Sequence, residues 1–136
     1  MTAAMLIVDD EQESREMLSR HFRYLGYEVA LAGNGLEALE QLAGKKFDVL
    51  ISDIMMPQMD GVALLRQVRN DYPMLRPIMI TGQVTMDNAL ACIRYGADYC
   101  FFKPLTDLTQ LEKAVSESLS KNQYWMQILK ELRGMK

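Results

Sequence analysis

The sequence predicts an α/β fold, a doubly wound parallel sheet of (βα)5 type followed by an extended C-terminal helix. Short apolar runs rich in β-branched residues alternate along the chain with segments of helical periodicity, which is the pattern of right-handed βαβ units. A length of 136 residues suits a single domain whose core needs no disulfide or metal to stabilise it. We therefore expect one domain built on one parallel sheet.

The expected strands are buried, because each is a short run of apolar residues. They cover residues 5–8, 27–31, 47–51, 77–80 and 99–102. Each expected helix has apolar residues three or four positions apart. These markers are Leu18, Phe22 and Leu25; Leu36, Leu39 and Leu42; Val62, Leu65 and Val68; Met86, Leu90 and Ile93; and Leu108, Leu111 and Val115. Glycines fall in the connections or at helix ends, where a positive φ or a close approach of two backbones is useful. They are Gly26, Gly33, Gly44, Gly61 and Gly96.

Composition argues against several classes of protein. The formal net charge is −3 and no basic cluster is long enough to follow a phosphate backbone, so we expect no direct binding to nucleic acid. Cys92 and Cys100 have neither metal-ligand spacing nor the density of a disulfide scaffold, which fits a reducing compartment. The N-terminus lacks the basic residues of a signal peptide, and no apolar run approaches the roughly eighteen residues of a membrane span. We expect a soluble, cytoplasmic protein without membrane contact.

Five polar residues stand at the downstream ends of the expected strands. Asp9 and Asp10 follow the first strand and Asp53 the third, while Thr81 follows the fourth and Lys103 the fifth. Because the carboxyl ends of parallel strands form one edge of the sheet, where ligands bind, these side chains should converge. Carboxylates bind hard Mg²⁺, and a hydroxyl and an ammonium contact phosphate oxygens. The set predicts a site that holds a divalent cation against a phosphoryl group.

With their neighbours, these residues resemble the receiver domain of bacterial two-component response regulators, the CheY-like superfamily. The resemblance covers about residues 4–120 and rests on VDDE at 8–11, DIMMP at 53–57 followed by Asp60 and Gly61, ITG at 80–82, and GAD at 96–98 leading to KP at 103–104. It implies a flavodoxin-like sheet with strand order 2-1-3-4-5. Residues 1–120 would form the receiver domain, and residues 121–136 a helical extension, either a linker or a coiled coil toward an output domain.

The resemblance also implies the roles of the acidic residues. Asp53 would be the phosphoacceptor, and the cofactor would be Mg²⁺ or Mn²⁺. Asp10 and Asp53 would bind the ion directly, Asp9 through a coordinated water, and Met55 through its main-chain carbonyl. Because the carbonyl is the ligand, the methionine side chain at position 55 is no obstacle.

The remaining site residues follow from the same resemblance. Lys103 would pair with Asp53 before phosphorylation and with a phosphoryl oxygen afterwards. A cis peptide at Pro104 would aim the lysine inward. Thr81 would turn its hydroxyl to the phosphoryl group, and Gly82 would leave room for the phosphate.

Position 100 departs from the family pattern. Receivers usually carry Tyr or Phe three residues before the lysine, and this aromatic swings inward when the Ser/Thr moves, whereas this chain has Cys100. Tyr99 should face the opposite side of the sheet because side chains alternate along a strand. We expect Cys100 to be a small buried hydrophobe, with a redox switch as the alternative.

Helical character persists from about residue 106 to 133, which is longer than one face of the domain needs. Residues along it recur at alternating steps of three and four, as in the seam of a coiled coil. They are Leu108, Leu111, Val115, Ser118, Asn122, Trp125, Leu129 and Leu132. We expect this helix to join two copies of the chain, with Asn122 favouring parallel pairing; the alternative is a tail without a partner.

The expected function is a phosphoacceptor switch rather than a dedicated enzyme. Asp53 would take phosphate from a sensor histidine kinase or a histidine phosphotransfer protein, and the face formed by the fourth helix, fifth strand and fifth helix would change partners. An aspartyl-phosphate phosphatase would need a second Asp at position 55, which is Met55 here. A flavin module would need a phosphate loop after the first strand, and a pseudo-receiver would not need the full set of site residues.

Overall fold

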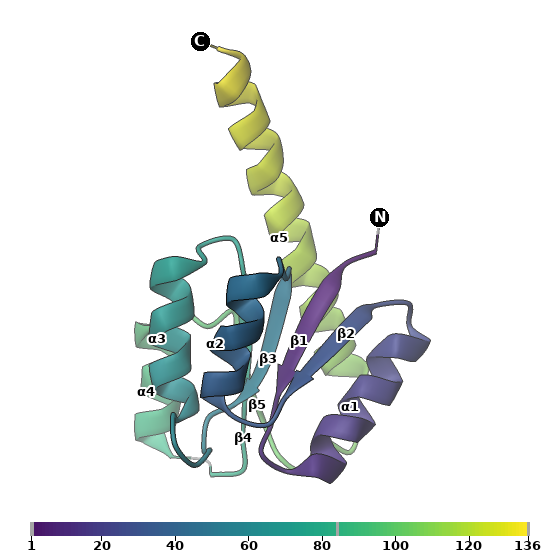
Figure 1. The fold of residues 1–136 in the computed structure, drawn as a ribbon, viewed down its shortest axis with the longest axis vertical. Helices are drawn as coiled ribbons and strands as arrows, with labels where there is room; N and C mark the ends of the chain where they lie inside the picture. Colours follow the sequence, from purple (N-terminus) through teal and green to yellow (C-terminus); the bar gives the residue numbers. More distant parts are fainter. Residues whose placement is uncertain (1, 84, 136) are drawn as a thin grey trace.

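The computed structural model describes residues 2–83 and 85–135, and these form five strands that alternate with five helices (Figure 1). The elements are β1 (Ala4–Val8), α1 (Gln12–Tyr24), β2 (Glu28–Ala32), α2 (Gly35–Gly44), β3 (Val49–Asp53), α3 (Gly61–Asp71), β4 (Arg76–Thr81), α4 (Met86–Arg94), β5 (Tyr99–Phe102) and α5 (Thr109–Gly134). The predicted domain ranges 1–120 and 121–136 include residues 1, 84 and 136, which lie outside the described residues. Among the described residues, no helix is both long enough and apolar enough to span a membrane.

The five strands form one parallel sheet in the order β2-β1-β3-β4-β5, so the predicted topology is confirmed. In the centre of the sheet Leu6 of β1 lies opposite Leu50 of β3, and Ile51 of β3 lies opposite Ile78 of β4. Every residue of β1 and β3 is buried. Helices cover both faces of the central strands, which explains why these strands are nearly continuous apolar runs in the sequence.

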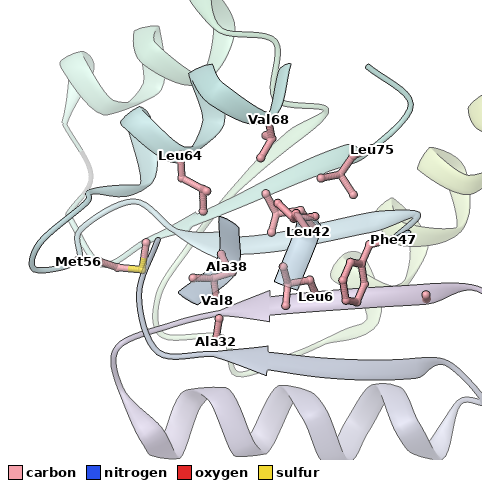
Figure 2. Packing of buried hydrophobic residues seen from close by; sticks show 12 residues of the cluster. Leu6, Val8, Ala32, Ala38, Leu42, Phe47, Met56, Leu64, Val68 and Leu75 are labelled. Atoms are coloured by element: carbon pink, nitrogen blue, oxygen red, sulfur yellow. The ribbon is translucent and has the colours of Figure 1, made fainter. Parts of the chain in front are cut away.

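Two helical layers enclose the sheet, with α1 and α5 on one face and α2, α3 and α4 on the other. Strand alternation divides the core between them. Met5 and Ile7 of β1 pack toward Phe22 of α1 and Val115 of α5. Leu6 and Val8, which alternate with them along β1, face the other layer. Figure 2 shows these two residues below side chains of α2 and α3, namely Ala38, Leu42, Leu64 and Val68.

Three helices begin at a side chain that accepts a hydrogen bond from the first turn. Asn34 caps α2, Asp60 caps α3 and Thr85 caps α4, each accepting from the amide three residues further on. Such a cap satisfies one of the amides left without a partner at a helix start. The Asp60 cap bears most directly on the predicted site, because α3 begins next to the end of β3.

The apolar residues that predict α4 do not form its buried face. Met86, Leu90 and Ile93 are exposed, Ile93 at 76%, whereas the buried residue of this helix is Cys92. The helix prediction is confirmed, and the residues that mark this helix in the sequence face solvent. The exposed side forms an apolar patch on the surface.

Helix α5 covers the sheet with its first half and continues beyond it (Figure 1). Leu111, Ala114 and Val115 are buried in the core, and Ser118 is also fully buried. Asn122 accepts a hydrogen bond from Nε of Arg76 at 2.7 Å and donates one to the carbonyl of Met74 at 2.8 Å. The expectation that Ser118 and Asn122 belong to a pairing seam is therefore wrong, since both face the chain's own domain.

Beyond Asn122, five apolar side chains of α5 are exposed. They are Tyr124, Trp125, Met126, Leu129 and Leu132. We call these five residues the α5 extension surface. A helix that leaves its domain with such residues exposed has an apolar stripe that its own fold does not cover.

Candidate functional site

The predicted site residues meet because the ends of neighbouring strands lie side by side. Asp53 is the last residue of β3 and lies opposite Ile80 of β4. Asp9 follows β1, the other neighbour of β3. The amide of Lys103 donates to the carbonyl of Thr81 at 2.8 Å, which joins the ends of β4 and β5. One edge of the sheet thus carries all of these side chains, as predicted.

Three carboxylates converge at this edge. Asp9, Asp10 and Asp53 each offer one oxygen, and these oxygens lie within 4.8 Å of one another. Asp9 and Asp53 are almost fully buried, whereas Asp10 is exposed. Two buried carboxylates this close repel each other unless a cation lies between them.

Lys103 supplies a positive charge to this cluster. Its Nζ lies 2.8 Å from Oδ2 of Asp53, 3.0 Å from Oδ2 of Asp9 and 2.7 Å from Oε1 of Glu11. Burial alone would lower the pKa of the Lys103 ammonium, but the hydrogen bonds to Asp53, Glu11 and Asp9 outweigh burial and raise it above its ordinary value. Lys103 is therefore a permanent cation in this site.

The carboxylate and the backbone carbonyl of Asp9 each accept a hydrogen bond. Its Oδ1 accepts from the amide of Glu11 at 2.9 Å, and its backbone carbonyl accepts from Nη1 of Arg15 at 2.7 Å. Burial raises the pKa of the Asp9 carboxyl, although the Glu11 amide and Lys103 both act in the opposite direction. A bound divalent cation would favour the charged form of Asp9 more strongly than Lys103 alone does.

The backbone around Asp53 is fixed by the start of α3. Oδ1 of Asp53 accepts from the amide of Met55 at 3.1 Å, and the amide of Gly61 donates to the carbonyl of Ile54 at 2.7 Å. A Cβ at Gly61 would lie 2.1 Å from the carbonyl oxygen of Asp53, well inside any allowed contact. The close backbone approach expected at this glycine is confirmed, and it positions the predicted phosphoacceptor.

Thr81 is fully buried, and its hydroxyl bonds to the next loop. Oγ1 accepts from the amide of Gln83 at 3.0 Å and donates to the Gln83 carbonyl, also at 3.0 Å. A Cβ at Gly82 would meet only Cδ of Lys103, at an ordinary contact distance of 4.0 Å. The loop after β4 therefore has room beside the lysine stem.

The two remaining predicted positions, Cys100 and Pro104, lie on either side of Lys103 in the sequence. The Lys103–Pro104 peptide is cis, as the resemblance implies. Cys100 is half-buried and packs with the α4 side of the core, while Tyr99 packs with the α5 side. The predicted opposite orientation of these two neighbours is confirmed.

The structure adds contacts that the sequence did not reveal. Glu11 lies in the recognised VDDE stretch, yet only the fold shows that it shares Lys103 with Asp9 and Asp53. Arg15 holds the carbonyl of Asp9 from the first turn of α1. Its spacing from Asp9 is a weak signal, because an arginine there also suits a solvated helix face.

The donor set fits a small hard cation. Mg²⁺ prefers octahedral oxygen ligands at about 2.0–2.1 Å, so oxygens bound to one ion lie roughly 3 to 4 Å apart. The oxygens of Asp9, Asp10 and Asp53 are within 4.8 Å of one another, a spacing compatible with ligands that bind one ion directly or through a water. The exposed side of the site is at Asp10, where water can complete the ligand shell.

Comparison with known proteins agrees with this geometry. Residues 5–116 match the family model of the response regulator receiver domain. The chain is 36% identical over 116 residues to the transcriptional regulatory protein ZraR of Klebsiella oxytoca, covering 85% of this chain and 26% of ZraR. It is 34% identical over 129 residues to the regulator of RpoS of Escherichia coli K12, covering 95% of this chain and 38% of that protein. The chain thus spans well under half the length of either relative.

A solved structure shows the same fold. The response regulator TrrA of Thermotoga maritima, determined in complex with Mg²⁺-BeF, superposes with a TM-score of 0.79 at 29% identity, covering 87% of this chain and 100% of that one. The family match covers most of the chain, and the strand order and acidic cluster agree with it. This chain belongs to the response regulator receiver domain family.

Proposed function

We propose that this chain is a phosphorylation-controlled switch in which Asp53 accepts a phosphoryl group from a histidine kinase or a histidine phosphotransfer protein. The contact between Lys103 and Asp53 carries the proposal. A lysine ammonium lies 2.8 Å from a buried carboxylate that also belongs to a cluster of metal-ligating oxygens. In this family the acidic pocket binds Mg²⁺.

The chemistry proposed for Asp53 is nucleophilic. A carboxylate oxygen attacks the phosphorus, the P–N bond of a phosphohistidine breaks, and the electron pair leaves with the imidazole nitrogen. Asp10, Asp53 and the carbonyl of Met55 would hold Mg²⁺ or Mn²⁺, with Asp9 acting through a water. When bound, the cation neutralises charge on the phosphoryl oxygens. Lys103 stabilises the same charge from the other side.

After transfer, the hydrogen bonds at the site must change. Lys103 loses a full carboxylate charge at Asp53 and gains a phosphoryl oxygen as its partner. The Thr81 hydroxyl now bonds to the Gln83 backbone, and a phosphoryl oxygen offers it a stronger, charged acceptor. We infer that Thr81 leaves Gln83 and draws the loop after β4 toward the site.

The proposed output face lies on α4 and the end of β5. Met86, Leu90 and Ile93 of α4 and Phe102 of β5 are exposed apolar side chains on adjacent elements. Movement of the loop between β4 and α4 would shift this patch directly. A partner protein that buries the patch in one state and not in the other would read the phosphorylation state.

Dephosphorylation by the chain itself is the second chemical step of the proposal. Met55 and Gln83 are exposed two residues beyond Asp53 and Thr81, where water must approach the acyl phosphate. An apolar methionine side chain neither orients nor activates that water. We therefore infer that Met55 hinders this hydrolysis.

We also propose that α5 joins two copies of the chain. The end of α5 projects beyond the sheet (Figure 1), and the residues of the α5 extension surface are exposed, so a second copy can reach them without disturbing the core. Pairing would bury Trp125, Leu129 and Leu132, which lie on one stripe because they are four and three residues apart. The paired segment would start after Asn122, because Asn122 and the residues before it pack on the domain.

The phosphoacceptor is tested with acetyl phosphate and Mg²⁺, followed by intact-mass measurement. We expect the wild-type chain to gain about 80 Da, the mass of one phosphoryl group, and Asp53→Asn to gain none. Asp71→Asn, which neutralises an exposed carboxylate at the end of α3, should be phosphorylated like wild type. Equal phosphorylation of wild type and Asp53→Asn would refute the proposal, as would full phosphorylation in EDTA.

A further inference from the structure

The two cysteines of the chain pack in one cluster, Cys92 from α4 and Cys100 from β5. Cys100 lies opposite Met79 of β4, and its side chain packs against the cluster that contains Met79 and Cys92. Its neighbours Tyr99 and Phe101 pack against the other side of the sheet. Strand alternation therefore directs Cys100 toward α4, where Cys92 is the buried residue.

Cys92 and Cys100 belong to the same packed cluster on the α4 side of the sheet, and the interaction between their thiols shifts the pKa of both. Cys92 is 5% exposed, whereas Cys100 is only half-buried, so Cys100 is the more accessible residue of the pair. The contact with Cys92 lowers the pKa of the Cys100 thiol to about 7, although burial acts in the opposite direction. The Cys100 contact, together with burial, raises the pKa of the Cys92 thiol.

The chain between the cysteines is anchored, so their approach is built into the fold. The amide of Ala97 donates to the carbonyl of Cys92 at 2.9 Å, directly after the end of α4. The amide of Asp98 donates to the carbonyl of Pro77 at 2.8 Å, which fixes the start of β5 against β4. These two bonds fix the end of α4, which carries Cys92, and the start of β5, which carries Cys100, within the domain.

We propose that Cys92 and Cys100 form a reversible disulfide when the protein meets a peroxide. The Cys100 thiolate attacks a peroxide oxygen, the O–O bond breaks, hydroxide leaves, and Cys100 becomes a sulfenic acid. The Cys92 thiol then attacks this sulfur, the S–S bond forms, the S–O bond breaks, and water leaves. In total, two thiols and one hydrogen peroxide give one disulfide and two waters. A dithiol reductant reverses the reaction by thiol–disulfide exchange.

The bond would act on the surface that the proposed function assigns to output, and this part of the inference depends on that function. A disulfide places its sulfurs about 2.05 Å apart, much closer than two thiols in contact, so its formation draws α4 toward β5. The patch of Met86, Leu90 and Ile93 lies on this helix. The oxidised chain would still accept phosphate at Asp53 but would hold α4 in one position.

The disulfide is tested on the full chain without reference to phosphorylation. Reduced protein is treated with hydrogen peroxide, denatured, alkylated with N-ethylmaleimide and weighed. We expect a loss of about 2 Da, no added maleimide, and a peptide pair joined through Cys92 and Cys100. Two alkylated cysteines would overturn the proposal. So would a sulfinic acid at Cys100 beside an alkylated Cys92, or a bond between two chains.

Two variants assign the roles within the pair. Cys92→Ala should leave a sulfenic acid at Cys100 that dimedone traps, because the resolving thiol is missing. Cys100→Ala should leave Cys92 unoxidised under the same conditions. In folded wild-type protein, which needs no substitution in the core, iodoacetamide should modify Cys100 at least about tenfold faster than Cys92 near neutral pH. Equal rates, or faster reaction at Cys92, would overturn the assignment.

Phosphorylation of the oxidised and reduced chains separates this inference from the proposed function. If acetyl phosphate labels Asp53 in neither form while the disulfide appears by mass, the proposed function fails and the disulfide stands. If Asp53 is labelled but no disulfide forms, only the redox inference fails. Where both are present, hydrogen exchange of α4 amides should slow at least about threefold on oxidation. Unchanged exchange would show that the bond does not restrain the helix.

Discussion

The ammonium of Lys103 lies 2.8 Å from Oδ2 of Asp53, although the two residues are fifty positions apart in the chain. The side chains are 15% and 5% exposed, so neither charge is well hydrated. Each group therefore depends on the other for the stabilisation that water would otherwise provide. Removing one partner leaves a buried charge without compensation.

Lys103→Met keeps the apolar stem and removes the charge, and we expect it to lower the free energy of unfolding by about 2–4 kcal/mol without Mg²⁺. Urea unfolding measures the change. Lys45→Met is the matched control, because Lys45 and its partner Glu28 are 46% and 56% exposed. Its effect should stay below about 0.5 kcal/mol. Equal effects of the two variants would show that the buried pair does not stabilise the fold.

Asp9→Asn should raise the melting temperature by a few degrees at pH 7 without Mg²⁺. Burial raises the folded-state pKa of Asp9 above the value of 3.8 that applies to the exposed group. Below pH 3.8 the Asp9 carboxyl is therefore protonated, and its stabilising contribution is fully present. This contribution is lost as the pH rises through the pKa that Asp9 has in the folded protein. At neutral pH the ionised group costs stability, which the amide avoids. The advantage of Asp9→Asn should shrink on acidification, whereas exposed Asp71→Asn should show no such trend.

Gly61→Ala should destabilise the domain by about 3 kcal/mol, because the new Cβ would lie 2.1 Å from the carbonyl oxygen of Asp53. Phosphorylation of Asp53 by acetyl phosphate should also slow, since the backbone of the phosphoacceptor must move. Gly44→Ala is the control, because a Cβ there meets nothing within 4 Å. It should be neutral or slightly stabilising. A Gly61→Ala chain as stable as Gly44→Ala would contradict the close approach.

Asn122→Ala should lower the free energy of unfolding by about 1–2 kcal/mol, since it removes the partners of Arg76 Nε and of the Met74 carbonyl together. Amides of α5 beyond this position should exchange faster, because the helix loses its last polar attachment to the domain. Asn70→Ala, which removes an exposed bond to the adjacent Asp71, is the control. No change in exchange after Asn122→Ala would mean that apolar packing alone holds the helix.

Leu129→Lys combined with Leu132→Lys should convert a dimer into a monomer in sedimentation experiments at micromolar concentration. Both side chains lie on the α5 extension surface, and two lysines per chain would repel across a paired helix. These variants are preferable to a truncation after Leu119, which would also remove the Asn122 contacts that belong to the domain. Wild type that sediments as a monomer would refute pairing through α5 and leave the receiver family assignment unaffected.

Much of the fold could be predicted because the central strands are apolar on both faces. Residues 77–80, for example, form a short apolar run that is typical of a buried strand, and the structure places them in β4. The strand ends then bring Asp53, Thr81 and Lys103 to one edge of the sheet, which explains why the site could be located before the fold was known. The roles of these three residues in phosphate chemistry stay predictions until they are tested.

Two features could not be predicted from local patterns. Met86, Leu90 and Ile93 mark α4 correctly, but periodicity does not say which side of a helix meets the sheet. Asn122 has the spacing of a seam residue, but a polar residue on a helix bonds as readily to its own domain as to a second copy. Both assignments depend on which surfaces lie nearby, and this information is absent from a local pattern.

Asn122 attaches α5 to the start of β4, at the edge of the domain. The rest of α5 can therefore tilt about this point as a rigid arm. At 1.5 Å per residue, the arm from Asn122 to Gly134 is about 18 Å long. A tilt of roughly 5° at the pivot would displace the far end by about 1.6 Å, a shift of the size found at regulated helix interfaces. A movement of α5 too small to disturb the core would thus be magnified along the helix.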